Sequence, residues 1–200
     1  MLATNLQPFL MGIVVSVLVG AALTLPISSA AICAAFGLTG LAGGAAVAGC
    51  CAQMIGFAIM SFKENGWGGL VSQGIGTSML QMGNIIKNPR IWIAPIVTSA
   101  ITGPVATCLF KLQMNGTAVS SGMGTCGFVG QIGVYSGWVN DVAAGTKSAI
   151  TMMDWAGLIL ISFVLPAVIC PLINWLLKKA GWVKDGDCLL YTSPSPRDIS

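Results

Sequence analysis

The stretch IWIAPIVTSAITGPVATCLF, residues Ile91–Phe110, decides the fold class, because it holds twenty uncharged residues between Arg90 and Lys111. At about 1.5 Å of rise per residue, a helix of this length covers ~30 Å, which is the hydrocarbon thickness of a bilayer. We therefore interpret Ile91–Phe110 as a transmembrane helix.

A second stretch of this kind is Trp155–Leu177, which lies between Asp154 and the pair Lys178–Lys179. Trp155 and Trp175 lie near its two ends, where indole rings favour the membrane interface. Two more apolar runs are Phe9–Leu25 and Gly44–Met60. The pattern predicts about four full spans.

The composition of the whole chain agrees with a membrane protein. Hydrophobic residues make up 55% and charged residues 8%, and no charged side chain precedes Lys63. Soluble domains carry roughly 25% charged residues. The net charge of +3 is too small and too scattered to suggest a nucleic-acid partner. We expect an all-α, polytopic helical membrane protein whose main partner is the lipid bilayer.

Three glycine-containing segments fit neither a full span nor an ordinary loop: Ile27–Gly43, Asn65–Ile86 and Leu112–Asn140. From Gly124 to Gly133 glycine recurs every third residue, and each glycine costs a helix roughly 1 kcal/mol relative to alanine. Irregular backbone at membrane depth is tolerated only inside protein or beside water. We predict re-entrant or half-helix segments, and surface loops or glycine packing grooves are the alternatives.

Positive charge predicts the orientation. Five basic residues flank the ends of spans that we place in the cytoplasm, together with the C-terminus. They are Lys63, Lys87, Arg90, Lys178 and Lys179. Lys111 and Lys147 are exceptions, and Asp141 and Asp154 fall on the outer side or in a pocket that opens there. The predicted location is the bacterial inner membrane, crossed several times.

Several chemistries are disfavoured by what the sequence lacks. It contains no histidine, so histidine acid–base catalysis and a phosphohistidine on this chain are excluded. The seven cysteines show no CxxC spacing, which argues against a metal or disulfide framework. No Walker loop, Rossmann fingerprint or catalytic triad is present, so an ATP-driven pump or a hydrolase is disfavoured. We expect no catalytic residue, metal or cofactor in this chain.

Polar side chains at membrane depth are costly and often functional. Glu64 is the only glutamate, and it could accept hydrogen bonds from sugar hydroxyls or form a water-facing pair with Lys63. Asn84 could belong to a binding patch or to a cytoplasmic anchor, and Gln131 could line a substrate path or satisfy nearby backbone. The candidate binding residues are Gln53, Glu64, Asn65, Gln73, Asn84 and Gln131.

Both ends of the chain depart from the pattern. Met1 leads almost directly into an apolar segment, so we expect residues 1–187 to form one membrane domain that is truncated at its N-terminus. LLYTSPSPRDIS, at 189–200, resembles a translated adaptor sequence. We interpret residues 188–200 as an adaptor-derived or disordered tail.

Five motifs resemble the membrane component, enzyme IIC, of the bacterial phosphotransferase sugar-uptake system. They are TLPISSAAI (24–32), GCCAQMIGFAIMSFKENGWGGLVSQGIGTSMLQ (49–81), KNPRIWIAP (87–95), GMGTCGFVGQIG (122–133) and AGWVKDGD (180–187). The resemblance covers about residues 1–187, which is the predicted domain.

The resemblance implies a phosphoenolpyruvate-dependent sugar permease subunit that works with IIA and IIB phosphocarrier components and forms a possible homodimer. IIB delivers the phosphoryl group, so this subunit binds the sugar without being phosphorylated. The family's sugar site uses a glutamate and a histidine. Glu64 could supply the first, and the second has no counterpart here. A non-phosphorylating solute transporter and a ligand-sensing membrane regulator are therefore the alternatives, and any enzymatic role depends on the resemblance.

Overall fold

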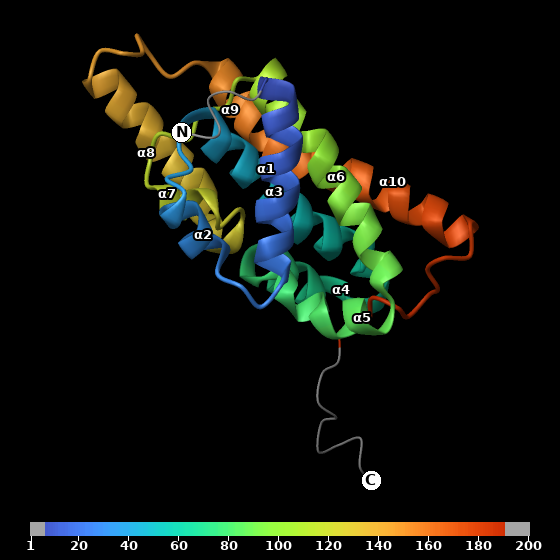
Figure 1. The fold of residues 1–200 in the computed structure, drawn as a ribbon. Helices are drawn as coiled ribbons and strands as arrows, with labels where there is room; N and C mark the ends of the chain where they lie inside the picture. The colour runs from blue at the N-terminus through green and yellow to red at the C-terminus, as the bar shows by residue number, and fades with distance from the viewer. Residues whose placement is uncertain (1–6, 191–200) are drawn as a thin grey trace.

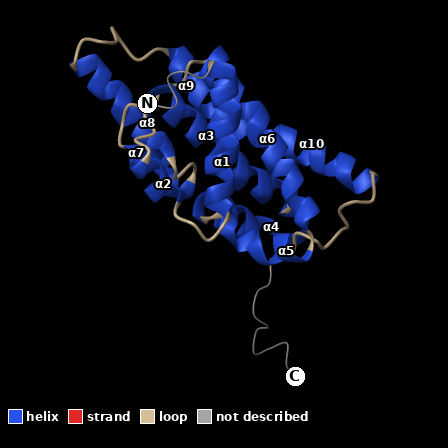
Figure 2. Cartoon of the chain, in the orientation of Figure 1, coloured by secondary structure: helices blue, strands red, loops and turns tan. Residues whose placement is uncertain are grey.

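The computed structural model describes residues 7–190, and every regular element in that range is helical (Figures 1 and 2). Three of these helices are long and apolar enough to cross a membrane: Gly40–Met60, Pro89–Leu109 and Met152–Lys179. A shorter apolar helix, α1, covers Pro8–Thr24. The prediction of an all-helical membrane protein is confirmed, and each of the four predicted spans coincides with one of these helices.

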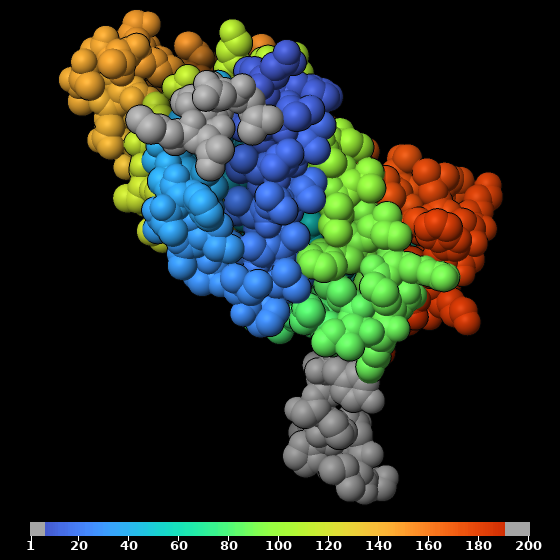
Figure 3. Space-filling model, viewed as in Figure 1, coloured from blue at the N-terminus to red at the C-terminus, as the bar shows by residue number. Residues whose placement is uncertain are grey.

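Helix α3 (Gly40–Met60) forms the centre of the molecule. It packs against α1, α6 (Ile93–Pro104) and α10 (Leu165–Lys179), and little of it is visible in the space-filling view (Figure 3). The crossing with α1 depends on glycine, because a Cβ at Gly49 would overlap the backbone of Ser16. Small residues at such crossings let helix backbones approach closely.

The two outer spans are built from several helical pieces. Pro89–Leu109 consists of the 3-10 turn η4 (Pro89–Trp92), α6 and the π turn η5 (Val105–Leu109). Met152–Lys179 consists of α9 (Met152–Ile159), the π turn η7 (Leu160–Val164) and α10. Pro166 follows η7 after one residue, Leu165. Because a proline ring collides with the carbonyl group four residues earlier, a widened turn before it relieves the clash.

The segment Ile27–Gly43 contains a short helix, α2 (Ser29–Ala35), and the start of α3. The Ser28 side chain caps α2 by accepting a hydrogen bond from the Ala31 backbone N–H. Helix α3 begins at Gly40, four residues before the predicted start at Gly44. Gly40 also forms an isolated antiparallel bridge with Met114, which fixes the loop after η5 against the start of α3.

The glycine-rich segment Asn65–Ile86 is helical for most of its length. It is covered by α4 (Phe62–Val71), the π turn η2 (Ser72–Gly76), the 3-10 turn η3 (Ser78–Gln81) and α5 (Met82–Lys87). Gly66 interrupts α4 with a φ of 58°, a conformation that glycine adopts easily. These short pieces lie across the end of the bundle where α3 ends (Figure 1).

The second glycine-rich segment, Leu112–Asn140, is more helical than its composition suggests. It holds α7 (Ala118–Ser121), the 3-10 turn η6 (Cys126–Phe128) and α8 (Val129–Ala143). Expecting poor helix formation throughout Gly124–Gly133 was wrong from Val129 onward. The reason is packing: a Cβ at Gly130 would overlap the Gly124 carbonyl oxygen, so glycine here permits close contact rather than disorder. Whether either segment is re-entrant stays a prediction.

Candidate functional site

Gln53, on α3, is fully buried, and both the oxygen and the nitrogen of its carboxamide form hydrogen bonds. Its Oε1 accepts from Thr24 Oγ1 at 3.2 Å and from Trp92 Nε1 at 3.0 Å. Its Nε2 donates to Ser99 Oγ at 3.3 Å. Gln53 therefore joins α3 to α1, η4 and α6. We call these four residues the Gln53 network.

A second set of buried polar side chains lies where α3 ends. Gln73 Nε2 donates to Ser61 Oγ at 2.9 Å, and Gln73 Oε1 accepts from Gln81 Nε2 at 2.8 Å. Gln81 Oε1 in turn accepts from Asn84 Nδ2 at 2.8 Å. Gln73 and Gln81 are fully buried. We call this chain of four, with Asn65 beside it, the amide network.

The two networks meet at η3. Ser78, at the start of this turn, shares a hydrogen bond of 2.9 Å with Thr24 of the Gln53 network. Gln81, at its end, belongs to the amide network. Thr77 caps the turn by accepting from the Met79 backbone N–H. A four-residue turn thus places two fully buried polar side chains in neighbouring networks.

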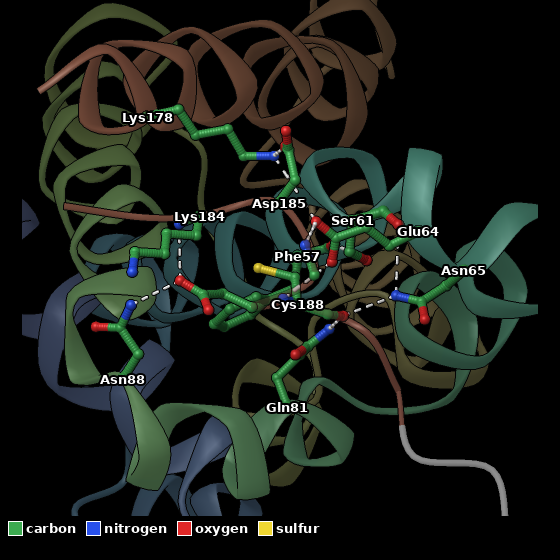
Figure 4. Close-up of polar contacts among 12 residues, drawn as sticks. Phe57, Ser61, Glu64, Asn65, Gln81, Asn88, Lys178, Lys184, Asp185 and Cys188 are labelled. Carbon is green, nitrogen blue, oxygen red and sulfur yellow. Dashed lines mark hydrogen bonds and ion pairs between the residues drawn. The ribbon is translucent and has the colours of Figure 1, made fainter. Parts of the chain in front are cut away.

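Glu64 faces the amide network from α4, and the segment that follows α10 holds its carboxylate (Figure 4). We call residues 180–190 the C-terminal segment. Gly186 N donates to Glu64 Oε1 at 3.0 Å and Cys188 N donates to Oε2 at 2.9 Å. Lys178 Nζ lies 3.7 Å from Oε1, and the Glu64 side chain is 12% exposed. The ion-pair partner of Glu64 is therefore Lys178, and the alternative of a water-facing Lys63–Glu64 pair is wrong.

The C-terminal segment is fixed by further contacts on the other side of the site. Asn88 Nδ2 and the Lys184 backbone N–H both donate to Asp187 Oδ2 at 2.8 Å. The Arg90 guanidinium lies over the Trp182 ring, 5.7 Å from its centroid. The bond from Asn88 (Figure 4) and the contact of Arg90 tie the segment to the turn between α5 and η4, while the Lys184 bond stabilises the segment itself.

The first three residues of the predicted tail, 188–190, join the amide network. The Cys188 carbonyl accepts from Asn65 Nδ2 at 2.8 Å and from Gln81 Nε2 at 2.9 Å. Residues 191–200, which hold the rest of the predicted tail, lie outside the described residues. The interpretation as an adaptor-derived or disordered tail stays a prediction.

Gln131 lies apart from both networks. From α8 its Nε2 donates to Cys51 Sγ at 3.3 Å, while its Oε1 is buried without a hydrogen-bond partner among the described residues. Nearby on η7, the buried Ser162 hydroxyl also lacks a partner in residues 7–190. The structure thus brings Glu64, Asn65, Gln73 and Asn84 together, places Gln53 in the adjoining network and leaves Gln131 elsewhere.

The candidate binding residues chosen from the sequence leave out several members of these networks: Thr24, Ser61, Gln81, Trp92 and Ser99. Thr24 and Ser99 lie inside the apolar runs that were assigned as spans, and both are fully buried. An isolated hydroxyl or amide within a membrane span is itself a signal, because such a group needs a partner in hydrocarbon. Applying that rule to every polar residue of the spans would have found Thr24 and Ser99.

The basic residues that were assigned to the cytoplasm lie together at one end of the bundle. The five that were assigned to the cytoplasm lie where α3 and α10 end and α6 begins. At the opposite end, Asp141 and Asp154 line one cavity of about 560 Å³, and that this end is the outer side stays a prediction. The molecule therefore carries two polar regions, separated by the length of α3.

A helical bundle with apolar spans and buried, uncharged hydrogen-bond networks defines a polytopic membrane protein. Comparison with known families narrows this class. The family described as "Phosphotransferase system, EIIC" matches residues 1–190, so the chain belongs to that family. Among curated proteins and solved structures, no match is found. The predicted resemblance to enzyme IIC is confirmed, and with it membership of a family of membrane subunits for sugar transport.

Proposed function

We propose that this chain is the sugar-translocating subunit of a phosphoenolpyruvate-dependent phosphotransferase system. It crosses the bacterial inner membrane several times with its C-terminus in the cytoplasm, and it works with IIA and IIB phosphocarrier components. The observation that carries the proposal is the amide network beside Glu64, the only glutamate of the chain. A homodimer stays a prediction.

The chemistry of this site suits a sugar. A carboxamide offers both donors and acceptors, and a sugar hydroxyl is likewise donor and acceptor. A carboxylate accepts hydrogen bonds from two hydroxyls at once, and such charge-assisted bonds are the stronger kind. In the present conformation the N–H groups of Gly186 and Cys188 take these acceptor positions. Sugar binding at Glu64 therefore requires the C-terminal segment to move aside.

The phosphoryl transfer itself needs little from this chain. The proposed role of Glu64 and the neighbouring amides is to hold a sugar hydroxyl in line with the phosphoryl group that IIB presents. Positioning of this kind accounts for much of the rate enhancement in phosphoryl transfer. The basic residues Lys63, Lys87 and Arg90 give this end a positive charge that favours an anionic phosphoryl donor.

A second candidate function is transport without phosphorylation. It is favoured by the absence of histidine, since the family's sugar site pairs a histidine with its glutamate. The two functions share the binding site and differ only in whether the sugar emerges phosphorylated. A ligand-sensing regulator would bind the sugar and transport none.

The test is uptake of radiolabelled monosaccharides and hexitols by vesicles that contain the protein, with and without IIA, IIB and phosphoenolpyruvate. We expect uptake of a phosphorylated sugar, and Glu64→Gln should abolish it because a neutral amide cannot replace the carboxylate. The control is Lys179→Gln, which removes a charge at the same end from an exposed side chain outside the C-terminal segment. It should transport like the unmodified protein.

The outcomes separate the candidates. Unchanged uptake by Glu64→Gln would remove Glu64 from the site. Sugar that emerges unphosphorylated, with all partner components present, would favour the non-phosphorylating transporter. Binding without uptake would favour the regulator.

A further inference from the structure

The cavity at the end of the bundle opposite Glu64 has a construction of its own. Its volume of about 560 Å³ falls within the range of small-molecule sites, roughly 300–1,000 Å³. The chain after η5, the helix α8 with the loop that follows it, and α9 together form its walls. We call it the outer pocket.

The charges in the outer pocket balance. Lys147 Nζ lies 2.7 Å from Asp154 Oδ2, and Asn115 Nδ2 donates to Asp141 Oδ2 at 2.7 Å. Lys111 also lines the pocket, and its ammonium forms no ion pair with any of residues 7–190. Two lysines and two aspartates give a formal charge of zero, which suits a neutral ligand rather than a phosphorylated one.

Several polar atoms of the pocket remain available. No hydrogen bond from the described residues engages Lys111 Nζ, Asn115 Oδ1 or Asp141 Oδ1. They provide donors and acceptors within one cavity, which is the combination that neighbouring hydroxyl groups require. Phe110 lines the same cavity, and its half-buried ring offers apolar surface for the C–H groups of a sugar.

Lys111 is unusual in two independent ways. Its φ of 46° places it in the left-handed region, which non-glycine residues seldom adopt and which costs about 1 kcal/mol or more. Lys111 and Lys147 are also the two lysines that violate the positive-inside pattern, and both line this pocket. The strained backbone of Lys111 and the two lysines on the side that the positive-inside rule disfavours thus occur in the same pocket.

We propose that the outer pocket is a second sugar-binding site, which receives a neutral monosaccharide or hexitol from outside the cell before translocation. Lys111 and Asp141 bind its hydroxyls. This inference rests on the proposed function, because a site on the outer face delivers substrate to the amide network at the inner face.

The first experiment measures uptake kinetics of the same labelled sugars. Lys111→Asn removes the ammonium and keeps a residue that tolerates positive φ. Asp141→Asn removes the carboxylate at similar size. Each should raise the apparent KM about tenfold, the typical effect of losing a hydrogen bond to a charged group, with the maximal rate within about twofold. The control is Lys179→Asn, at the opposite end, which should leave KM unchanged. An unchanged KM in both pocket variants overturns the proposal.

The second experiment needs no transport and no loss of a binding group. Gln113 is exposed and lines the pocket, so Gln113→Cys should react with a membrane-impermeant maleimide in right-side-out vesicles, above the background of the unmodified protein. D-glucose, D-galactose, D-ribose and D-mannitol are the probes, and at least one should slow the labelling. Labelling that no probe slows, or that occurs only from the inner side, refutes the outer pocket. If the unmodified protein takes up none of these sugars, the proposed transport function is refuted. Slower labelling of Gln113→Cys in the presence of a sugar would still show that the pocket binds it.

Discussion

The central helix α3 and the outer span Met152–Lys179 are both long and apolar, yet they are used in opposite ways. In the most apolar stretch of 18 residues of α3, 89% is buried inside the protein. The corresponding share in Met152–Lys179 is 33%, although that helix is the more hydrophobic of the two. In a soluble protein the more hydrophobic helix would be the more buried. Here hydrocarbon can replace protein around an apolar side chain, so high hydrophobicity marks the surface.

What marks the interior is small size. Helix α3 is rich in glycine, alanine and cysteine, and it takes neighbours on nearly every side. The outer span instead presents large side chains outward, such as Val168, Leu172 and Trp175. Without a hydrophobic force between helices in lipid, close packing and interhelical hydrogen bonds hold a membrane bundle together. Four tests follow, from the largest expected effect to the smallest.

Gly49→Ala should prevent α3 from assembling with α1. The added Cβ would overlap the Ser16 carbonyl oxygen, and a backbone cannot move aside as a side chain can. We expect a loss of more than ~3 kcal/mol, above the usual cost of overpacking, seen as little folded protein in detergent. Gly83→Ala makes the same chemical change where no atom lies within 4 Å and should be neutral or slightly stabilising. Equal stability of the two variants would refute the close packing of α3.

Within the outer span, Ile161 and Leu172 allow the inner and outer faces to be compared. Ile161 is fully buried against the core around Val47 and Cys51, while Leu172 is 58% exposed. Ile161→Ala should cost about 2–5 kcal/mol through the cavity that it leaves, and Leu172→Ala under ~1 kcal/mol because lipid fills the space. Thermal unfolding in detergent, followed by tryptophan fluorescence, measures both. A larger loss at Leu172 would mean that protein covers this face.

Gln53→Leu tests whether hydrogen bonds hold the interior of α3. The change preserves volume but leaves Trp92 Nε1 and Ser99 Oγ without one of their partners. Each buried group left unpaired costs about 1–3 kcal/mol. The same substitution at the exposed Gln113 is the matched control and should change the unfolding temperature little. A stable Gln53→Leu protein would show that size alone selects the interior of α3.

The smallest effect is expected where the end of the outer span meets the C-terminal segment. Lys178 donates a hydrogen bond to Asp185, which lowers the pKa of that carboxyl. Because the pKa of Asp185 is lower in the folded state, this bond stabilises the protein fully above the unfolded-state pKa of ~3.9. The stabilisation is lost as pH falls through the folded-state pKa of Asp185. Thermal unfolding of the unmodified protein and of Asp185→Asn should therefore differ slightly at pH 5 and converge at lower pH. A difference that grows on acidification would contradict this sign.

The spans could be predicted from the sequence because their signal is local. Met60 ends α3 as expected, and Ile91–Phe110 agrees with Pro89–Leu109 to within two residues at the start and one at the end. An uncharged run of fixed length needs no knowledge of its neighbours. The glycine-rich segments could not be predicted in this way. Helix α8 forms despite Gly130 and Gly133 because contacts with Gly124 and Ser120 outweigh the low helix propensity of glycine.

The candidate site was predictable in kind but not in arrangement. Glu64, Asn65, Gln73 and Asn84 are close in the chain, so local reasoning placed them near one another. The partners of Gln53 come from three other elements, and Ser99 is 46 residues away in sequence. Nor could spacing reveal that Glu64 pairs with Lys178 and binds the backbone of Gly186, which lies 122 residues further along the chain.

The π turn η7 determines how Met152–Lys179 is wound near the outer pocket. A π turn accommodates one residue more than an α turn, so it rotates the helix beyond it by roughly 100° from the position that an unbroken α-helix would give. This angular step separates α9 from α10 in Met152–Lys179. In Pro89–Leu109 the π turn η5 ends the helix, and directly after it the Phe110 ring lies against Gly157 of α9, where a Cβ would overlap it. A helical wheel drawn straight through Met152–Lys179 is therefore out of phase in α9, where Gly157 and Asp154 line the outer pocket.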